Sequence, residues 1–140
     1  MDRSIIKKWY KFMFLMGLFL LVQAASAHAA DILLEVFYLP HGPAMAVVSE
    51  VEKVASEFPN LTLKKYDFED TANRPVIVQH KLTAHMPIAI FINGKDTFTI
   101  GGKNLTLRNF PKGNAFVPMF AGEWDYPDLR ALLTGAAKGK

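Results

Sequence analysis

The 140-residue sequence contains no cysteine. Without a thiol the chain forms no disulfide, attaches no c-type haem and offers neither a thiolate metal ligand nor a cysteine nucleophile. Thiol–disulfide exchange is excluded as well, because that reaction starts with attack by a thiolate. We therefore expect the fold to be held by packing and hydrogen bonding alone.

The sequence also lacks an apolar run of about 20 residues, the length that a membrane-spanning helix needs. The run at residues 12–22 is shorter, follows a basic stretch and precedes a series of small residues ending at Ala29 and Ala30. This order is typical of a secretory signal peptide, with an uncleaved anchor as the alternative. We expect residues 1–29 to be removed by cleavage after Ala29 or, alternatively, after Ala27, leaving a periplasmic or secreted protein without a stable membrane span.

Outside residues 1–27 the sequence has no excess of positive charge. The chain has a formal net charge of +3, but residues 1–27 hold four basic side chains and one acidic one, so the remainder is neutral. No basic stripe with interleaved aromatic residues follows, and such a stripe is the usual footprint of a nucleic-acid-binding protein. The sequence therefore predicts no nucleic-acid partner.

Hydrophobic patterning predicts a single α/β domain over residues 30–140. Continuous apolar runs are typical of buried strands, alternation is typical of half-buried strands, and a period near 3.6 residues is typical of helices. These patterns predict strands at 32–39, 61–67, 87–92 and 97–100, and helices at 44–58, 75–82 and 127–133. The order is β-α-β-α-β-β-α, and strand–helix–strand units favour parallel pairing.

Two further features concern the second half of the chain. Asn93-Gly94 is a strong hairpin signal, which predicts that residues 97–100 return beside 87–92 as the antiparallel edge of a four-stranded mixed sheet. Residues 103–125 contain apolar side chains without a clear period. They are interpreted either as a long loop packed on the domain or as an apolar surface for a partner.

A family resemblance rests on three segments. The first strand is followed by His41-Gly42-Pro43-Ala44, and residues 85–94 read His-Met-Pro-Ile-Ala-Ile-Phe-Ile-Asn-Gly. Glu35 is a charge within the first apolar strand. Over residues 31–102 these features resemble the thioredoxin family, which has Cys-Gly-Pro-Cys at that junction, a cis-proline before its third core strand and a buried carboxylate beneath the redox pair. His41 and Ala44 stand in place of the two cysteines, and the family's N-terminal strand and helix have no counterpart.

The resemblance implies a thioredoxin-like fold and a cis peptide bond at Pro87, while the missing cysteines exclude the family's redox activity. In the family, the backbone beside the cis-proline pairs with an extended client peptide, a mode that uses main-chain groups and needs no thiol. The implied binding surface consists of the former active-site loop His41, Gly42, Pro43 and Ala44, together with Glu35, Tyr38, Met86 and Pro87. An apolar shelf would be completed by Leu39, Pro40 and Phe110 or Phe116.

The resulting hypothesis is an exported, non-catalytic domain that binds a protein or peptide through the former active-site face. The first alternative is a copper-binding accessory protein, because imidazole and thioether are ligands that suit copper; its ligands would be His41 and Met86, with His85 or His28. A second alternative is a hydrolase or transferase that uses Glu35 and His41. No cofactor is expected under the main hypothesis.

Overall fold

The computed structural model describes residues 29–83, 86–113 and 118–139. The expected signal peptide falls almost wholly on residues 1–28, outside the described residues. Within the described ranges, no helix combines the length and apolar character needed to span a bilayer.

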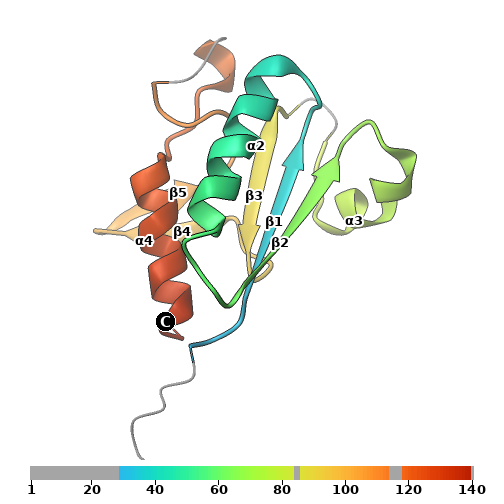
Figure 1. The fold of residues 1–140 in the computed structure, drawn as a ribbon. Helices are drawn as coiled ribbons and strands as arrows, with labels where there is room; N and C mark the ends of the chain where they lie inside the picture. The colour runs from blue at the N-terminus through green and yellow to red at the C-terminus, as the bar shows by residue number, and fades with distance from the viewer. Residues whose placement is uncertain (1–28, 84–85, 114–117, 140) are drawn as a thin grey trace, which may run out of the picture.

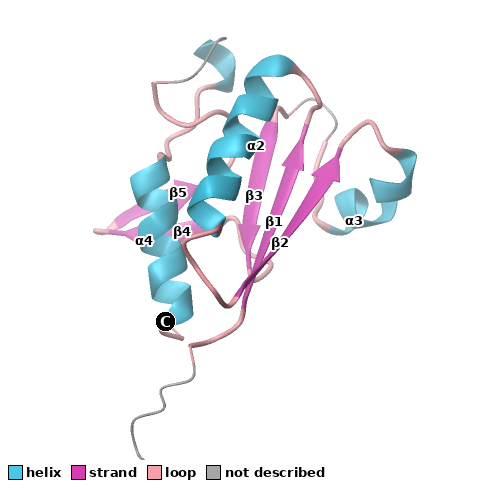
Figure 2. Ribbon diagram, in the orientation of Figure 1, coloured by secondary structure: helices cyan, strands magenta, loops and turns pink. Residues whose placement is uncertain are grey.

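The fold is mixed α/β, with two small sheets and three α-helices in the described part of the chain (Figure 2). The predicted segments were found close to their expected positions. The strands are β1 (Ile32–Tyr38), β2 (Leu61–Asp67), β3 (Ile88–Ile92), β4 (Thr97–Ile100) and β5 (Lys103–Thr106), and the α-helices are α2 (Gly42–Ala55), α3 (Arg74–Gln79) and α4 (Tyr126–Ala137). Short 3-10 turns, η2 (Thr71–Asn73) and η3 (Pro118–Phe120), precede α3 and α4.

The central sheet has the strand order β2-β1-β3. β1 pairs in parallel with β2, as the intervening helix requires, and antiparallel with β3. α2 and α4 pack on one face of this sheet, whereas α3 lies beyond β2 and helps to cover the other face (Figure 1).

Helix boundaries follow the local sequence. Pro43 stands in the first turn of α2, where its missing N–H costs no hydrogen bond. The first turn of α4 is closed by reciprocal bonds between Asp125 and Asp128, each side chain accepting from the other's backbone N–H.

The predicted four-stranded sheet is wrong. Asn93 and Gly94 do form the expected turn, with φ values of 51° and 78°, and Lys95 pairs with Ile92 directly after it. The chain then turns away, because β4 pairs with β5 in a separate two-stranded ribbon.

The outer edge of β3 is met instead by residues 107–109. Ile90 N–H donates to Leu107 C=O (2.9 Å) and Asn109 N–H donates to Ile88 C=O (2.8 Å). All five residues of β3 are buried, so this strand needs a buried neighbour, and Leu107 is fully buried. β4 does not meet that need, because its side chains alternate between exposed and half-buried.

Most of the large apolar side chains in the described parts of this segment, residues 103–113 and 118–125, join the core, in agreement with the packed-loop interpretation. Leu105, Leu107, Phe110 and Trp124 are buried, and Trp124 Nε1–H donates to Asn109 C=O at 3.1 Å. Met119, in contrast, has 75% of its surface exposed.

Candidate functional site

The loop that follows β1 presents His41 at the start of α2. Its backbone is extended (φ −112°, ψ 155°), as is usual for a residue that precedes a helix, and its side chain makes no capping hydrogen bond. The imidazole is 63% exposed, and its Nε2 atom lies 3.4 Å from Oε1 of Glu69. Ala44 is buried and Met45 is exposed. The loop therefore places a polar and an apolar side chain at the surface, on an anchored helix start.

Three segments meet at this end of the sheet. Leu39 N–H donates to Pro87 C=O (3.1 Å), and Phe68 N–H donates to Tyr38 C=O (2.9 Å). The end of β1, the end of β2 and the start of β3 are thus adjacent, and Pro87 lies beside the loop after β1, as the resemblance implied. We refer to residues 39–43, 68–69 and 86–87 together as the loop edge.

The predicted cis peptide bond is wrong. No peptide bond between described residues is cis, so Met86–Pro87 is trans. Most X–Pro bonds in folded proteins are trans, and only about 5–6% are cis. Pro87 is nevertheless buried, and its C=O accepts a hydrogen bond from Leu39 N–H. The trans proline therefore still lies beside the loop that follows β1.

The expected apolar shelf is divided between the two faces of the sheet. Met86 packs against the cluster of Phe37, Leu82, Ala89 and Phe91, whereas Tyr38 packs against the α2–α4 core. Phe110 is itself part of that core, and Phe116 lies outside the described residues. The exposed side chains at the loop edge are polar, His41 and Glu69, and the half-buried Met86 forms no backbone–backbone hydrogen bond within the described residues.

Glu35 is the buried carboxylate that the sequence predicted, and the structure gives it two partners. His80 Nε2 lies 3.2 Å from Glu35 Oε2, and the side chains are only 11% and 8% exposed. Tyr66 O–H donates to Glu35 Oε1 across 3.5 Å, at the outer limit for a hydrogen bond. His80 Nδ1 lies 2.9 Å from the carbonyl oxygen of Val76 in α3.

The contact between Glu35 Oε2 and His80 Nε2 requires a hydrogen on one of these two atoms. A carbonyl oxygen only accepts, so His80 Nδ1 carries a hydrogen. Nε2 faces a carboxyl oxygen; either an imidazolium donates to a carboxylate, or a protonated Glu35 donates to a neutral ring. In both states every buried polar atom of the pair is satisfied, and this contact fastens the end of α3 to β1.

Aromatic rings enclose this polar pair. The centroid of Phe37 lies 4.8 Å from that of Tyr66 and 4.9 Å from that of His80, while the Phe91 ring meets His80 edge-on at 4.5 Å. Burial raises the pKa of the Tyr66 hydroxyl above its ordinary value, and the adjacent Glu35 charge adds to that shift. We refer to the buried Glu35 and its half-buried partners Tyr66 and His80 together as the buried triad.

Sequence reasoning found Glu35 but missed its partners. His80 follows a short helix 45 positions from Glu35, and no local pattern joins the two residues. The one available signal was Glu35 itself, because a charge inside an apolar strand requires a buried partner.

The other proposed chemical combinations involve residues that the structure separates into different pairs. His41 lies beside Glu69, and Glu35 contacts His80, so the two residues suggested for a hydrolase have separate partners. No group of three or more His, Asp or Glu side chains capable of holding a metal occurs within residues 29–83, 86–113 and 118–139. His28 and His85, named as copper ligands, lie outside these ranges.

Comparison of the chain with family models, with curated proteins and with solved structures found no match.

Proposed function

We propose that the chain is an exported, redox-inactive thioredoxin-like domain that binds an extended segment of a partner protein at the loop edge. The strand order β2-β1-β3, with one parallel and one antiparallel pairing, supports this kinship. The burial of Glu35 supports the likeness, because the resemblance implies a buried carboxylate in this strand, and the absence of cysteine removes thiol chemistry.

The observation on which the proposal chiefly rests is the backbone of Met86. Met86 lies two residues before β3, next to Pro87, whose C=O accepts from Leu39, and its own N–H and C=O form no backbone hydrogen bond within the described residues. A strand from a partner can pair with these free backbone groups, because every non-proline residue carries one strong donor and one strong acceptor on its main chain. Such pairing derives affinity from main-chain groups and specificity from the side chains nearby.

The exposed side chains at the loop edge and in the first turn of α2 suit a segment of mixed character. Met45 is 42% exposed and offers a flexible apolar contact. His41 and Glu69 provide one donor–acceptor pair at the same edge. A partner segment would therefore place an apolar side chain towards Met45 and a polar one towards His41.

Site-specific photo-crosslinking in exporting cells tests this function. A photoreactive residue at position 45 should form a covalent adduct with one discrete partner, whereas the same residue at the exposed position 138 should not. Met86→Pro, which removes one backbone donor, should abolish the adduct, and Met86→Leu should preserve it. Equal adduct yields from positions 45 and 138, or from both Met86 variants, would contradict the proposal.

A further inference from the structure

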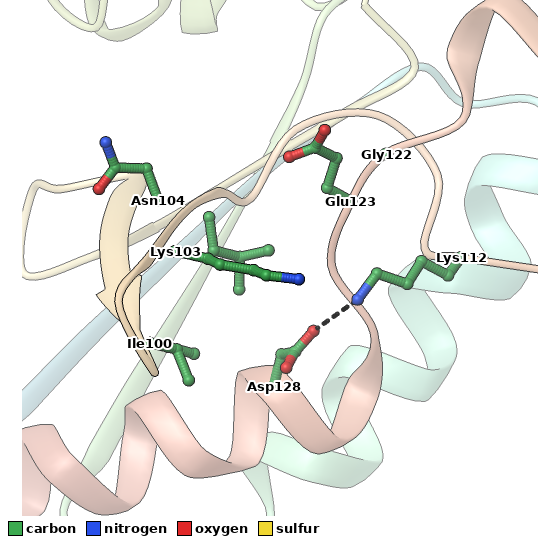
Figure 3. A pocket seen from close by; sticks show the side chains of 8 residues that line it. Ile100, Lys103, Asn104, Lys112, Gly122, Glu123 and Asp128 are labelled. Carbon is green, nitrogen blue, oxygen red and sulfur yellow. Dashed lines mark hydrogen bonds and ion pairs between the residues drawn. The ribbon is translucent and has the colours of Figure 1, made fainter.

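A pocket of about 450 Å³ lies between the β4–β5 ribbon and the start of α4. Its walls come from the segment that the sequence left unexplained, residues 103–125, together with Ile100 and Asp128 (Figure 3). The volume falls within the range of about 300–1,000 Å³ that is common for small-molecule sites. The pocket shares no residue with the loop edge, so it is independent of the proposed function.

Two opposite charges in this pocket lack a partner. Lys103 and Glu123 both line it, yet neither forms an ion pair with any residue of the described part of the chain. In Figure 3 the Lys103 side chain extends into the pocket between those of Glu123 and Asp128. Lys103 and Glu123 form no ion pair with each other, so both charges stay available to a ligand in the pocket.

The remaining walls limit the ligand's size and polarity. Lys112 Nζ lies 3.4 Å from Asp128 Oδ2, so these two charges largely compensate each other. Ile100 and Leu105 add an apolar portion to the pocket. The ligand should therefore combine one anionic group, one cationic group and a compact apolar part.

The wall near Glu123 is fixed by close backbone packing. A Cβ atom on Gly122 would stand 2.4 Å from the carbonyl oxygen of Arg108 and 2.7 Å from that of Phe110, so only glycine fits at this position. Phe110 N–H and Gly122 N–H donate to Phe120 C=O and Phe110 C=O at 2.9 and 2.7 Å. These backbone hydrogen bonds between residues 110 and 120–122 fix the position of the backbone next to Glu123.

We propose that this pocket binds a small zwitterion, an α-amino acid with an apolar side chain. Its carboxylate pairs with Lys103, its ammonium group pairs with Glu123, and its side chain lies against Ile100 and Leu105. Both contacts are charge-assisted hydrogen bonds, which are the stronger kind in proteins.

Isothermal titration of the exported chain with three related compounds tests the assignment. L-leucine carries both charges, L-leucinamide lacks the carboxylate and N-acetyl-L-leucine lacks the ammonium group. We expect saturable binding of leucine, weakened about tenfold or more in each analogue, as loss of one charged hydrogen bond predicts.

Substitutions at the two unpaired charges provide a second test. Lys103→Gln and Glu123→Gln should each weaken leucine binding about tenfold, while Lys138→Gln, an exposed lysine at the end of α4, should leave it unchanged. Both pocket side chains are exposed, so the variants should fold normally. Absence of saturable leucine binding, equal binding of all three compounds, or equal effects of the pocket and control variants would overturn the proposal.

Discussion

The two faces of the central sheet are built from different chemistry. The face beneath α2 and α4 is a continuous apolar core containing side chains such as Leu34, Val36 and Ile90. The face beneath α3 contains aromatic rings around the buried triad of Glu35, Tyr66 and His80. A buried ion pair is poor evidence for added stability, because desolvation offsets the attraction between its charges. The comparison suggests that the first face drives folding, while the second holds α3 in one defined position.

The largest expected effect lies on the apolar face. Leu34 is fully buried, so Leu34→Ala should lower the free energy of unfolding by about 2–5 kcal/mol through lost burial and a residual cavity. Chemical denaturation measures this change. Val78→Ala is the control, because Val78 on α3 is 66% exposed and its loss should alter stability by less than about 0.5 kcal/mol. Similar losses of unfolding free energy in Leu34→Ala and Val78→Ala would contradict the distinction between the apolar core and the exposed surface of α3.

A double-mutant cycle tests the polar face. His80→Leu and Glu35→Leu each leave a buried polar side chain without its main partner, and each should cost about 1–3 kcal/mol. Replacing both residues, as Glu35→Leu with His80→Leu, should restore most of that loss, because apolar substitution of a buried pair is often neutral. Denaturation of the single and double variants gives the coupling energy. Additive losses would show that the two side chains do not act as a pair.

A smaller gain is expected in the helix that covers the apolar face. Gly135 lies within α4, and a Cβ atom at this position would meet no atom within 4 Å. Gly135→Ala should therefore raise the free energy of unfolding by about 0.5–1 kcal/mol, since alanine loses less backbone entropy. Thermal unfolding reports the change. A loss of stability would mean that α4 packs more tightly at this point than the structure indicates.

The smallest effect concerns alkaline pH. Because the pKa of Tyr66 is raised in the folded state, the unfolded chain loses this proton first as the pH increases. The stabilising contribution is complete below the ordinary tyrosine pKa of about 10 and is lost as the pH rises through the higher folded value. Tyr66→Phe should therefore make the alkaline fall in stability shallower, as followed by unfolding at several pH values. An unchanged slope would place Tyr66 outside the buried triad.

The element order could be predicted from the sequence because it depends on local patterns. The alternation from Leu61 to Tyr66 gave β2, and the valines from Val47 to Val54 gave α2. The Asn93-Gly94 turn was also predictable, since both residues adopt the positive φ values that this dipeptide favours.

The strand pairing after that turn could not be predicted in the same way. Local signals favoured a continuous hairpin, but pairing depends on which segment can bury a partner for β3, and Leu107 meets that need from beyond the ribbon. β5 was missed because Lys103 and Asn104 resemble a loop. At the candidate site, the sequence identified Glu35 and the loop around His41, whereas the contact with His80 arises only from tertiary structure.

Native mass spectrometry of the exported chain, with and without added copper, tests the central claim that the loop edge binds protein rather than metal. The account predicts a metal-free complex with a partner protein that is lost in Met86→Pro and retained in Met86→Leu. A chain without a protein partner that carries one tightly held copper, lost in His41→Ala, would contradict the account and favour the copper-binding alternative.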